Sequence, residues 1–166
     1  DQDKEGCETS IRAFKEDTLI IGAGDFKDAY NLRVVEKDGI KVGLLCLVHK
    51  EFGALGLDSK PSDYGTAWIN HPLVNKTILN AKKECDLLIV LPHAGVEDVV
   101  VPLPEWRARY KEFIDMGADT VIASHPHTPQ GWEEYNGKKI FYSLGNFFFQ
   151  LFSNQHGENW YKGLIV

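Results

Sequence analysis

Asp86–His93 (DLLIVLPH) and Asp119–His127 (DTVIASHPH) are the two stretches that determine the architecture of this chain. Each begins with a short, continuous apolar run, which is typical of a buried strand in a parallel sheet. Between them, Pro104–Met116 carries apolar and aromatic residues at helical spacing, with a proline suited to the first turn. This order predicts a β-α-β unit whose strands, Asp86–Leu91 and Asp119–Ala123, run parallel.

The rest of the chain alternates short apolar runs with amphipathic segments, which predicts an α/β fold. Two Xaa-Gly pairs, Asp38-Gly39 and Asn136-Gly137, are strong signals for tight β-hairpins. We expect a helix that ends within Thr9–Lys15 and a second helix at His71–Cys85. One hairpin should join Leu32–Glu36 to Lys41–Val48, and another should join Trp132–Tyr135 to Lys139–Ser143. A long surface loop is expected at Lys50–Asn70 and a β-like run at Lys162–Val166. The charged start and apolar end suggest one incomplete domain, cut at both ends.

Composition excludes several classes of protein. Among 166 residues, 18 are Lys or Arg and 24 are Asp or Glu, so the formal net charge is −6. That balance argues against binding to nucleic acid or to an anionic membrane surface. No apolar run approaches the roughly 20 residues of a membrane span, and the start lacks a signal segment. The 3 cysteines contain no Cys-x-x-Cys pair, so neither a disulfide framework nor a zinc knuckle is expected.

Three histidines follow the two predicted parallel strands. His93 ends the first, and His125 and His127 follow the second. Neighbouring strands lie about 4.8 Å apart, and their carboxyl ends form the sheet edge at which α/β proteins bind ligands. Imidazoles with a nearby carboxylate such as Glu97 suit a borderline divalent cation, namely Zn, Mn or Fe. Because Pro126 biases its predecessor to an extended backbone, the two later histidines are expected to face the same way, toward one or two adjacent centres.

Other interpretations of the polar motifs stay open or are disfavoured. A His-x-His pair after a strand can also cap a turn, which would be a purely structural role. His49, His71 and His156 lack this context and are interpreted as surface or helix-end residues. Ser143 is outside any Gly-x-Ser-x-Gly motif, so a serine hydrolase has little support. The aromatic run Phe147–Phe149 is expected in the core or at an interface.

Three segments together resemble the CapA capsule-biosynthesis family, a branch of the calcineurin-like metallophosphoesterase superfamily. They are residues 91–97 (LPHAGVE), 115–129 (DMGADTVIASHPHTP) and 137–148 (GKKIFYSLGNFF). The resemblance implies a sandwich of two β-sheets flanked by helices, with a metal site at the strand ends. It implies the following roles: metal ligands His93, His125 and His127, a catalytic acid–base or ligand Glu97, and a substrate-binding Asn146.

The chain also departs from the family pattern. Ala94 stands where the family usually has Trp, and Ala123 where it has Gly. The family's first-half ligands, an Asp, a second acidic motif and an Asn-Asn-His segment, have no match here. The resemblance therefore implies that this chain supplies at most half of a two-metal site.

Two hypotheses for function follow from the resemblance. The first is a metal-dependent phosphoesterase-type protein of poly-γ-glutamate capsule or surface-polymer biosynthesis, with a divalent and possibly binuclear metal (Mn, Fe or Zn). Two ions about 3.5–4 Å apart would clamp a phosphoryl group and activate a water. The second is a non-catalytic scaffold of a polymer synthesis or export complex. Implied partners are a surface polymer or phosphoester substrate and a membrane-associated synthesis complex, at an extracytoplasmic or cell-surface location.

Overall fold

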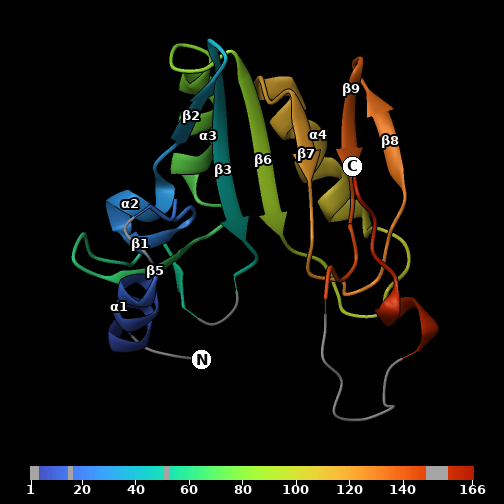
Figure 1. Cartoon of the computed structure of the whole chain (residues 1–166), viewed down its shortest axis with the longest axis horizontal. Coiled ribbons are helices and arrows are strands. Elements are labelled where there is room, and N and C mark those ends of the chain that lie inside the picture. Colours follow the sequence, from blue (N-terminus) through green and yellow to red (C-terminus); the bar gives the residue numbers. More distant parts are fainter. Residues whose placement is uncertain (1–3, 15–16, 51–52, 149–156) are drawn as a thin grey trace.

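The computed structural model describes residues 4–14, 17–50, 53–148 and 157–166. It contains a six-stranded sheet, in the order β2-β3-β6-β7-β9-β8, and a three-stranded sheet, in the order β1-β5-β4 (Figure 1). The helices are α1 (Lys4–Ala13), α2 (Phe26–Tyr30), α3 (Pro72–Ala81), α4 (Pro104–Met116) and the 3₁₀ helix η1 (Glu158–Tyr161). The strands are β1 (Ala23–Asp25), β2 (Arg33–Lys37), β3 (Ile40–Val48), β4 (Ala54–Leu55), β5 (Tyr64–Ala67), β6 (Leu87–His93), β7 (Thr120–Ile122), β8 (Trp132–Tyr135) and β9 (Lys138–Phe141).

The predicted β-α-β unit is present. Strands β6 and β7 pair in parallel, with Ile89 opposite Thr120 and Val90 opposite Val121, and α4 connects them. β3 pairs in parallel with β6, and β9 pairs in parallel with β7. Four neighbouring strands therefore end at the same edge of the sheet, at the bottom of Figure 1.

Both predicted hairpins are confirmed. Asp38 and Gly39, with φ of 53° and 79°, join β2 to β3, and Asn136 and Gly137, with φ of 51° and 73°, join β8 to β9. Two consecutive left-handed residues form the type I′ turn, whose twist matches that of the strands it connects.

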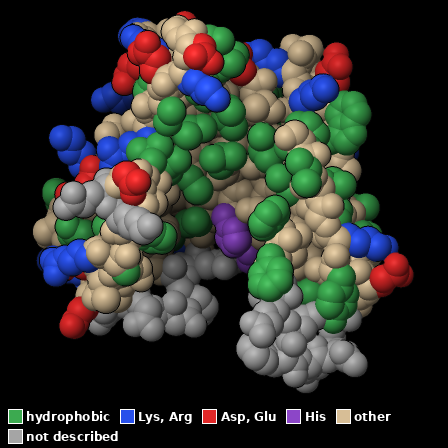
Figure 2. All heavy atoms as spheres, viewed as in Figure 1, with side chains coloured by type: hydrophobic (Ala, Val, Ile, Leu, Met, Phe, Trp, Pro, Cys, Tyr) green, Lys and Arg blue, Asp and Glu red, His purple; other side chains and the backbone are tan. Residues whose placement is uncertain are grey.

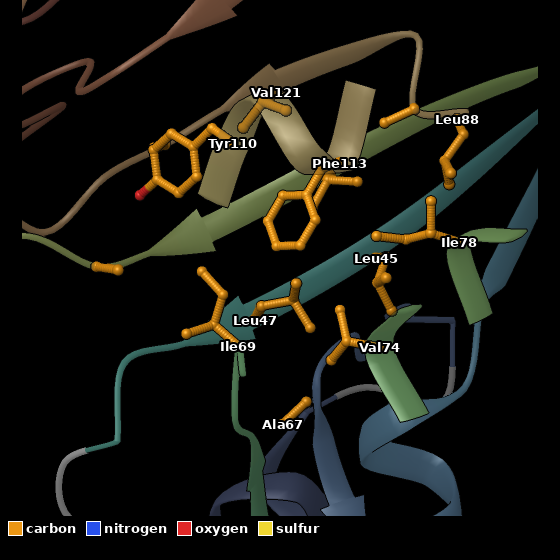
Figure 3. Packing of buried hydrophobic residues seen from close by; sticks show 14 of the residues in the cluster. Leu45, Leu47, Ala67, Ile69, Val74, Ile78, Leu88, Tyr110, Phe113 and Val121 are labelled. Atoms are coloured by element: carbon orange, nitrogen blue, oxygen red, sulfur yellow. The ribbon is translucent and has the colours of Figure 1, made fainter. Parts of the chain in front are cut away.

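Helices α3 and α4 cover one face of the large sheet and form the core with it (Figure 3). In α3, Val74, Ile78 and Ala81 follow one another at spacings of four and three residues, and all three are buried. In α4, the predicted core stripe of Trp106, Tyr110 and Phe113 is also buried. These side chains meet the sheet residues Leu45, Leu47, Leu88, Val90, Val121 and Ile140.

The opposite face of the large sheet is apolar but less buried. In β6, Leu88 and Val90 are buried, whereas Ile89 and Leu91 are half-buried and Leu87 is 45% exposed. The predicted buried strand is therefore fully buried on one face only, because the described helices pack against that face. Figure 2 shows the apolar side chains of the other face in the centre of the view, with charged side chains around its rim.

The prediction of a long loop at Lys50–Asn70 was wrong in part. β5 alternates half-buried and buried residues, and it pairs with β1 and β4 to form the small sheet. Leu55, Ala67 and Ile69 are buried in the core. The segment is ordered by the pairing of its own strands β4 and β5 and by the pairing of β5 with β1. Its many turn-forming residues hide these short strands in the sequence.

The predicted elements near the termini also need correction. α1 begins at Lys4 and ends at Ala13, and none of its residues is buried. In the expected run Lys162–Val166, only Gly163 forms a bridge, to Gly145, and Ile165 is 95% exposed. One bridged pair is too little to hold a strand.

Three remaining sequence interpretations can be placed. His71 is the N-cap of α3, where Nδ1 accepts a hydrogen bond from the Leu73 N–H, as expected of a helix-end residue. His49 is half-buried, and its ring makes a T-shaped contact with the ring of Trp106. Phe147 and Phe148 are 98% and 78% exposed, so they are not core residues, and both Phe149 and His156 lie outside the described residues.

Within the described ranges, no helix is long and apolar enough to span a bilayer.

Candidate metal centre

The loops that follow β6 and β7 are joined by backbone contacts. The Ala94 N–H donates to the Ser124 carbonyl at 3.0 Å, and the Ser124 N–H donates to the Pro92 carbonyl at 2.9 Å. Gly95, with a φ of 142°, lies so close to Pro126 that an added Cβ would stand 2.8 Å from the proline Cγ. These contacts fix the positions of the two histidine-bearing loops relative to each other.

His93 and His125 lie side by side at this edge. Nε2 of His93 is 3.2 Å from Nδ1 of His125, and Nδ1 of His93 is 3.2 Å from the Ser124 hydroxyl. Two imidazole nitrogens bound tetrahedrally to one zinc ion, each at about 2.0–2.1 Å, are about 3.3 Å apart. The two rings are joined here by a hydrogen bond, and the same separation also suits two ligands of a single cation.

The backbone of the second loop is left-handed at both histidines. φ is 106° at His125 and 57° at His127, so the expected extended conformation was wrong. The Pro126 carbonyl accepts a hydrogen bond from the Asp98 N–H at 2.9 Å, and Gly95 packs against the Pro126 ring. These two contacts hold the loop that bears His125 and His127. Such conformations cost about 1–3 kcal/mol for a non-glycine residue and are concentrated at functional sites.

His127 faces a different set of partners. Its ring centroid is 6.1 Å from that of His125, and its ring stacks on Trp160 at 4.4 Å. Nδ1 of His127 is 2.7 Å from Oδ1 of Asn146. The structure therefore places Asn146 against a candidate ligand. Trp160 was not anticipated, because its segment has no periodic pattern that would mark it.

Glu97 is exposed to solvent. It lies in the exposed turn after β6, four residues beyond His93. Across the residues that the structure describes, no three or more His, Cys, Asp or Glu side chains are grouped so that they could hold an ion. The metal-binding and catalytic roles of these residues thus stay predictions, and the structure contributes the proximity of His93 and His125.

A hollow of about 360 Å³ adjoins the Trp160 side of the histidine loop. Its lining includes Asp98, Thr128 and Asn159. The Thr128 hydroxyl is buried and makes no hydrogen bond within the described structure. A small polar space therefore lies next to the candidate centre.

The arrangement of two β-sheets flanked by helices is also found in a solved structure. A solved structure named "Putative 5'-Nucleotidase from Staphylococcus aureus in complex with alpha-ketoglutarate" matches 81% of this chain and 28% of its own, with a TM-score of 0.53. At 17% sequence identity, this likeness shows the fold alone.

The chain belongs to the family described as "Bacterial capsule synthesis protein PGA_cap", whose sequence model matches residues 1–151. The "Capsule biosynthesis protein CapA" of Bacillus anthracis is 35% identical over 156 residues, which are 90% of this chain and 37% of the relative. The "PGA biosynthesis protein CapA" of Bacillus subtilis (strain 168) is 31% identical over 148 residues, covering 87% and 38%. The chain thus spans less than two fifths of the length of these relatives.

Proposed function

We propose that this chain supplies the histidine part of a divalent-metal site in a capsule-synthesis protein that cleaves phosphoester bonds. The observation that carries the proposal is the 3.2 Å separation between Nε2 of His93 and Nδ1 of His125. These nitrogens come from the ends of neighbouring parallel strands, where α/β proteins place ligands. Membership of a capsule-synthesis family supports the biological setting.

Each residue has a distinct role in this proposal. His93 and His125 hold one ion, and His127 provides a ligand for a second ion beside it. Imidazoles suit Zn, Mn and Fe, and such an ion, when bound, supplies a Lewis acid and an activated water. Glu97 is a further ligand or exchanges protons with the substrate or water. The substrate is a phosphoester or the surface polymer, and the setting is a membrane-associated synthesis complex outside the cytoplasm.

Bound-metal content tests the metal site. Elemental analysis of the full-length protein that contains this chain, supplemented with Mn, Fe or Zn, should show near-stoichiometric metal that is lost in the His125→Ala/His127→Ala double variant. His71→Asn is the matched control, since asparagine preserves a helix N-cap and His71 lies outside the site. It should retain the metal.

The outcomes separate the two hypotheses for function. Protein that remains metal-free at saturating supplementation contradicts the metal site and favours the non-catalytic scaffold. Protein that binds metal is then assayed for hydrolysis of p-nitrophenyl and bis(p-nitrophenyl) phosphate. Full metal loading without hydrolysis of either compound contradicts the phosphoesterase chemistry.

A further inference from the structure

We propose that Asn146 is a positioning residue that fixes the tautomer of His127 and so decides which ring nitrogen can bind a metal. The inference deepens the proposed function. Its statement about metal binding rests on that function, whereas its statement about the tautomer concerns the metal-free protein. It replaces the substrate-binding role that the resemblance implied for Asn146.

The orientation of the Asn146 amide is determined by its neighbours. Nδ2 donates to the backbone carbonyl of Trp160 at 2.9 Å and to the backbone carbonyl of His127 at 3.3 Å. Carbonyl oxygens only accept hydrogen bonds, so the nitrogen of the amide must be on this side. Oδ1 must then be the atom that faces the His127 ring.

This orientation passes to the imidazole. Oδ1 of Asn146 only accepts and lies 2.7 Å from Nδ1 of His127, so Nδ1 must carry the proton. In the neutral ring the lone pair is then on Nε2. A hydrogen bond to one ring nitrogen determines which of the two nitrogens carries the proton. In metal sites, such hydrogen bonds also orient the imidazole ligands.

The network is held by a close approach of two chain segments. The Leu164 N–H donates to the Leu144 carbonyl at 2.8 Å, and Gly145 and Gly163 form an antiparallel bridge. A Cβ on Gly145, whose φ is 72°, would stand 2.4 Å from the Lys162 carbonyl oxygen. The segment that bears Trp160 is therefore held against Asn146, which keeps both amide N–H groups engaged.

His71 provides an internal reference of opposite tautomer. Its Nδ1 accepts the Leu73 N–H at 3.2 Å, so the proton of its neutral ring must be on Nε2. Within one molecule, the structure thus assigns Nδ1–H to His127 and Nε2–H to His71.

Imidazole ¹⁵N chemical shifts test this assignment directly. Protein labelled with ¹⁵N-histidine is measured with a chelator at alkaline pH, where the rings are neutral. His127 should show a protonated Nδ1 and His71 a protonated Nε2. Asn146→Ala should move His127 toward the Nε2–H form and leave His71 unchanged. Asn159→Ala is the matched control, because this amide lies in the same segment and contacts Lys162 instead; it should alter neither ring.

Two results would overturn the inference: wild-type His127 protonated on Nε2, or an Asn146→Ala variant that keeps the Nδ1–H form. The first needs no variant, so it remains informative if Asn146→Ala fails to fold. In a separate zinc titration, Asn146→Ala should weaken binding by about 10- to 100-fold. If the tautomers are as assigned and the wild type binds no metal, the proposed function fails while the positioning role of Asn146 stands.

Discussion

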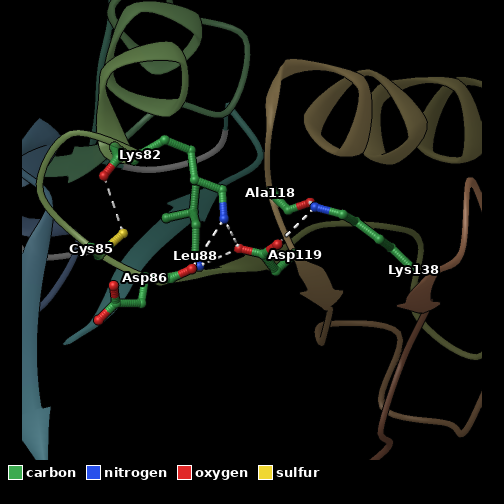
Figure 4. A network of polar contacts seen from close by, with 8 residues as sticks. Lys82, Cys85, Asp86, Leu88, Ala118, Asp119 and Lys138 are labelled. Carbon is green, nitrogen blue, oxygen red and sulfur yellow. Dashed lines mark hydrogen bonds and ion pairs between the residues drawn. The ribbon is translucent and has the colours of Figure 1, made fainter. Parts of the chain in front are cut away.

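The amino and carboxyl ends of the parallel strands both gather polar side chains, but they use them differently. At the amino end, Asp119 accepts hydrogen bonds from Lys82, from Lys138 at 2.7 Å and from the Leu88 N–H at 2.8 Å (Figure 4). At the carboxyl end, His93 and His125 bring two ring nitrogens within 3.2 Å. The first arrangement pairs opposite charges, whereas the second is a hydrogen bond between two imidazoles.

The difference indicates which end is structural and which is a site. One carboxylate with two ammonium groups and an N–H is a self-sufficient set that joins the starts of β6, β7 and β9. At the other end, His125 and His127 adopt left-handed backbone conformations. Such a conformation persists only where the surrounding contacts impose it. Each of the four predictions below perturbs one of the two ends.

Gly95→Ala should have the largest effect and act at the carboxyl end. The new methyl group would meet Pro126 at 2.8 Å, at a φ of 142° that suits glycine. We expect a loss of about 3 kcal/mol in the free energy of unfolding, from strain of this kind. Metal binding should fall as well, because the His125 loop must move. Urea denaturation measures the first and metal titration the second. Gly131→Ala, where an added Cβ meets nothing within 4 Å, is the control and should change neither.

Asp119→Ala should destabilise the amino end by about 2 kcal/mol, because the Leu88 N–H loses its acceptor and two lysines lose their partner. Metal affinity should remain that of the wild type. Asp115→Ala serves as the control, since that carboxylate is exposed and accepts hydrogen bonds from Tyr135 and Asn136. A large loss of metal affinity in Asp119→Ala would show that the two ends are coupled and contradict the distinction.

Asp119, at the amino end, should also make the free energy of unfolding depend on pH in the acid range. Burial acts to raise the pKa of Asp119, but hydrogen bonds from Lys138, Lys82 and Leu88 outweigh it, so the pKa lies below its ordinary value. The unfolded carboxyl titrates near pH 3.9, so this contribution is present above about pH 4 and is lost as pH falls through the folded pKa. The stability difference between wild type and Asp119→Asn should therefore shrink below about pH 4. Unfolding curves across that range would contradict this if the difference stayed constant.

Local patterns account for the parts that could be predicted from the sequence. The strands of the β-α-β unit follow from apolar runs, and the hairpins follow from Asp38-Gly39 and Asn136-Gly137. The approach of His93 to His125 also follows, since consecutive parallel strands that are neighbours end at one edge.

Contacts between distant segments account for the parts that could not. The left-handed backbone at His125 and His127 depends on Gly95 and Asp98, which belong to another loop. The setting of His127 depends on Trp160, from a segment without periodicity. The strands of the small sheet are two to four residues long, and their pairing joins β5 to both β1 and β4. None of these features leaves a pattern in its own stretch of sequence.

Ser124→Ala should have the smallest effect. It tests whether the Ser124 hydroxyl must orient the His93 ring for metal binding, or whether the proximity of His93 to His125 is enough. The serine hydroxyl lies 3.2 Å from Nδ1 of His93, on the side of the ring opposite His125. Loss of one hydrogen bond of about 1 kcal/mol should weaken metal binding by about fivefold. Stability should change little, and Ser10→Ala on the exposed helix α1 should change neither quantity. Unchanged metal affinity in Ser124→Ala would mean that the backbone contacts between the two loops suffice to orient His93, so that the hydroxyl contributes nothing to the site.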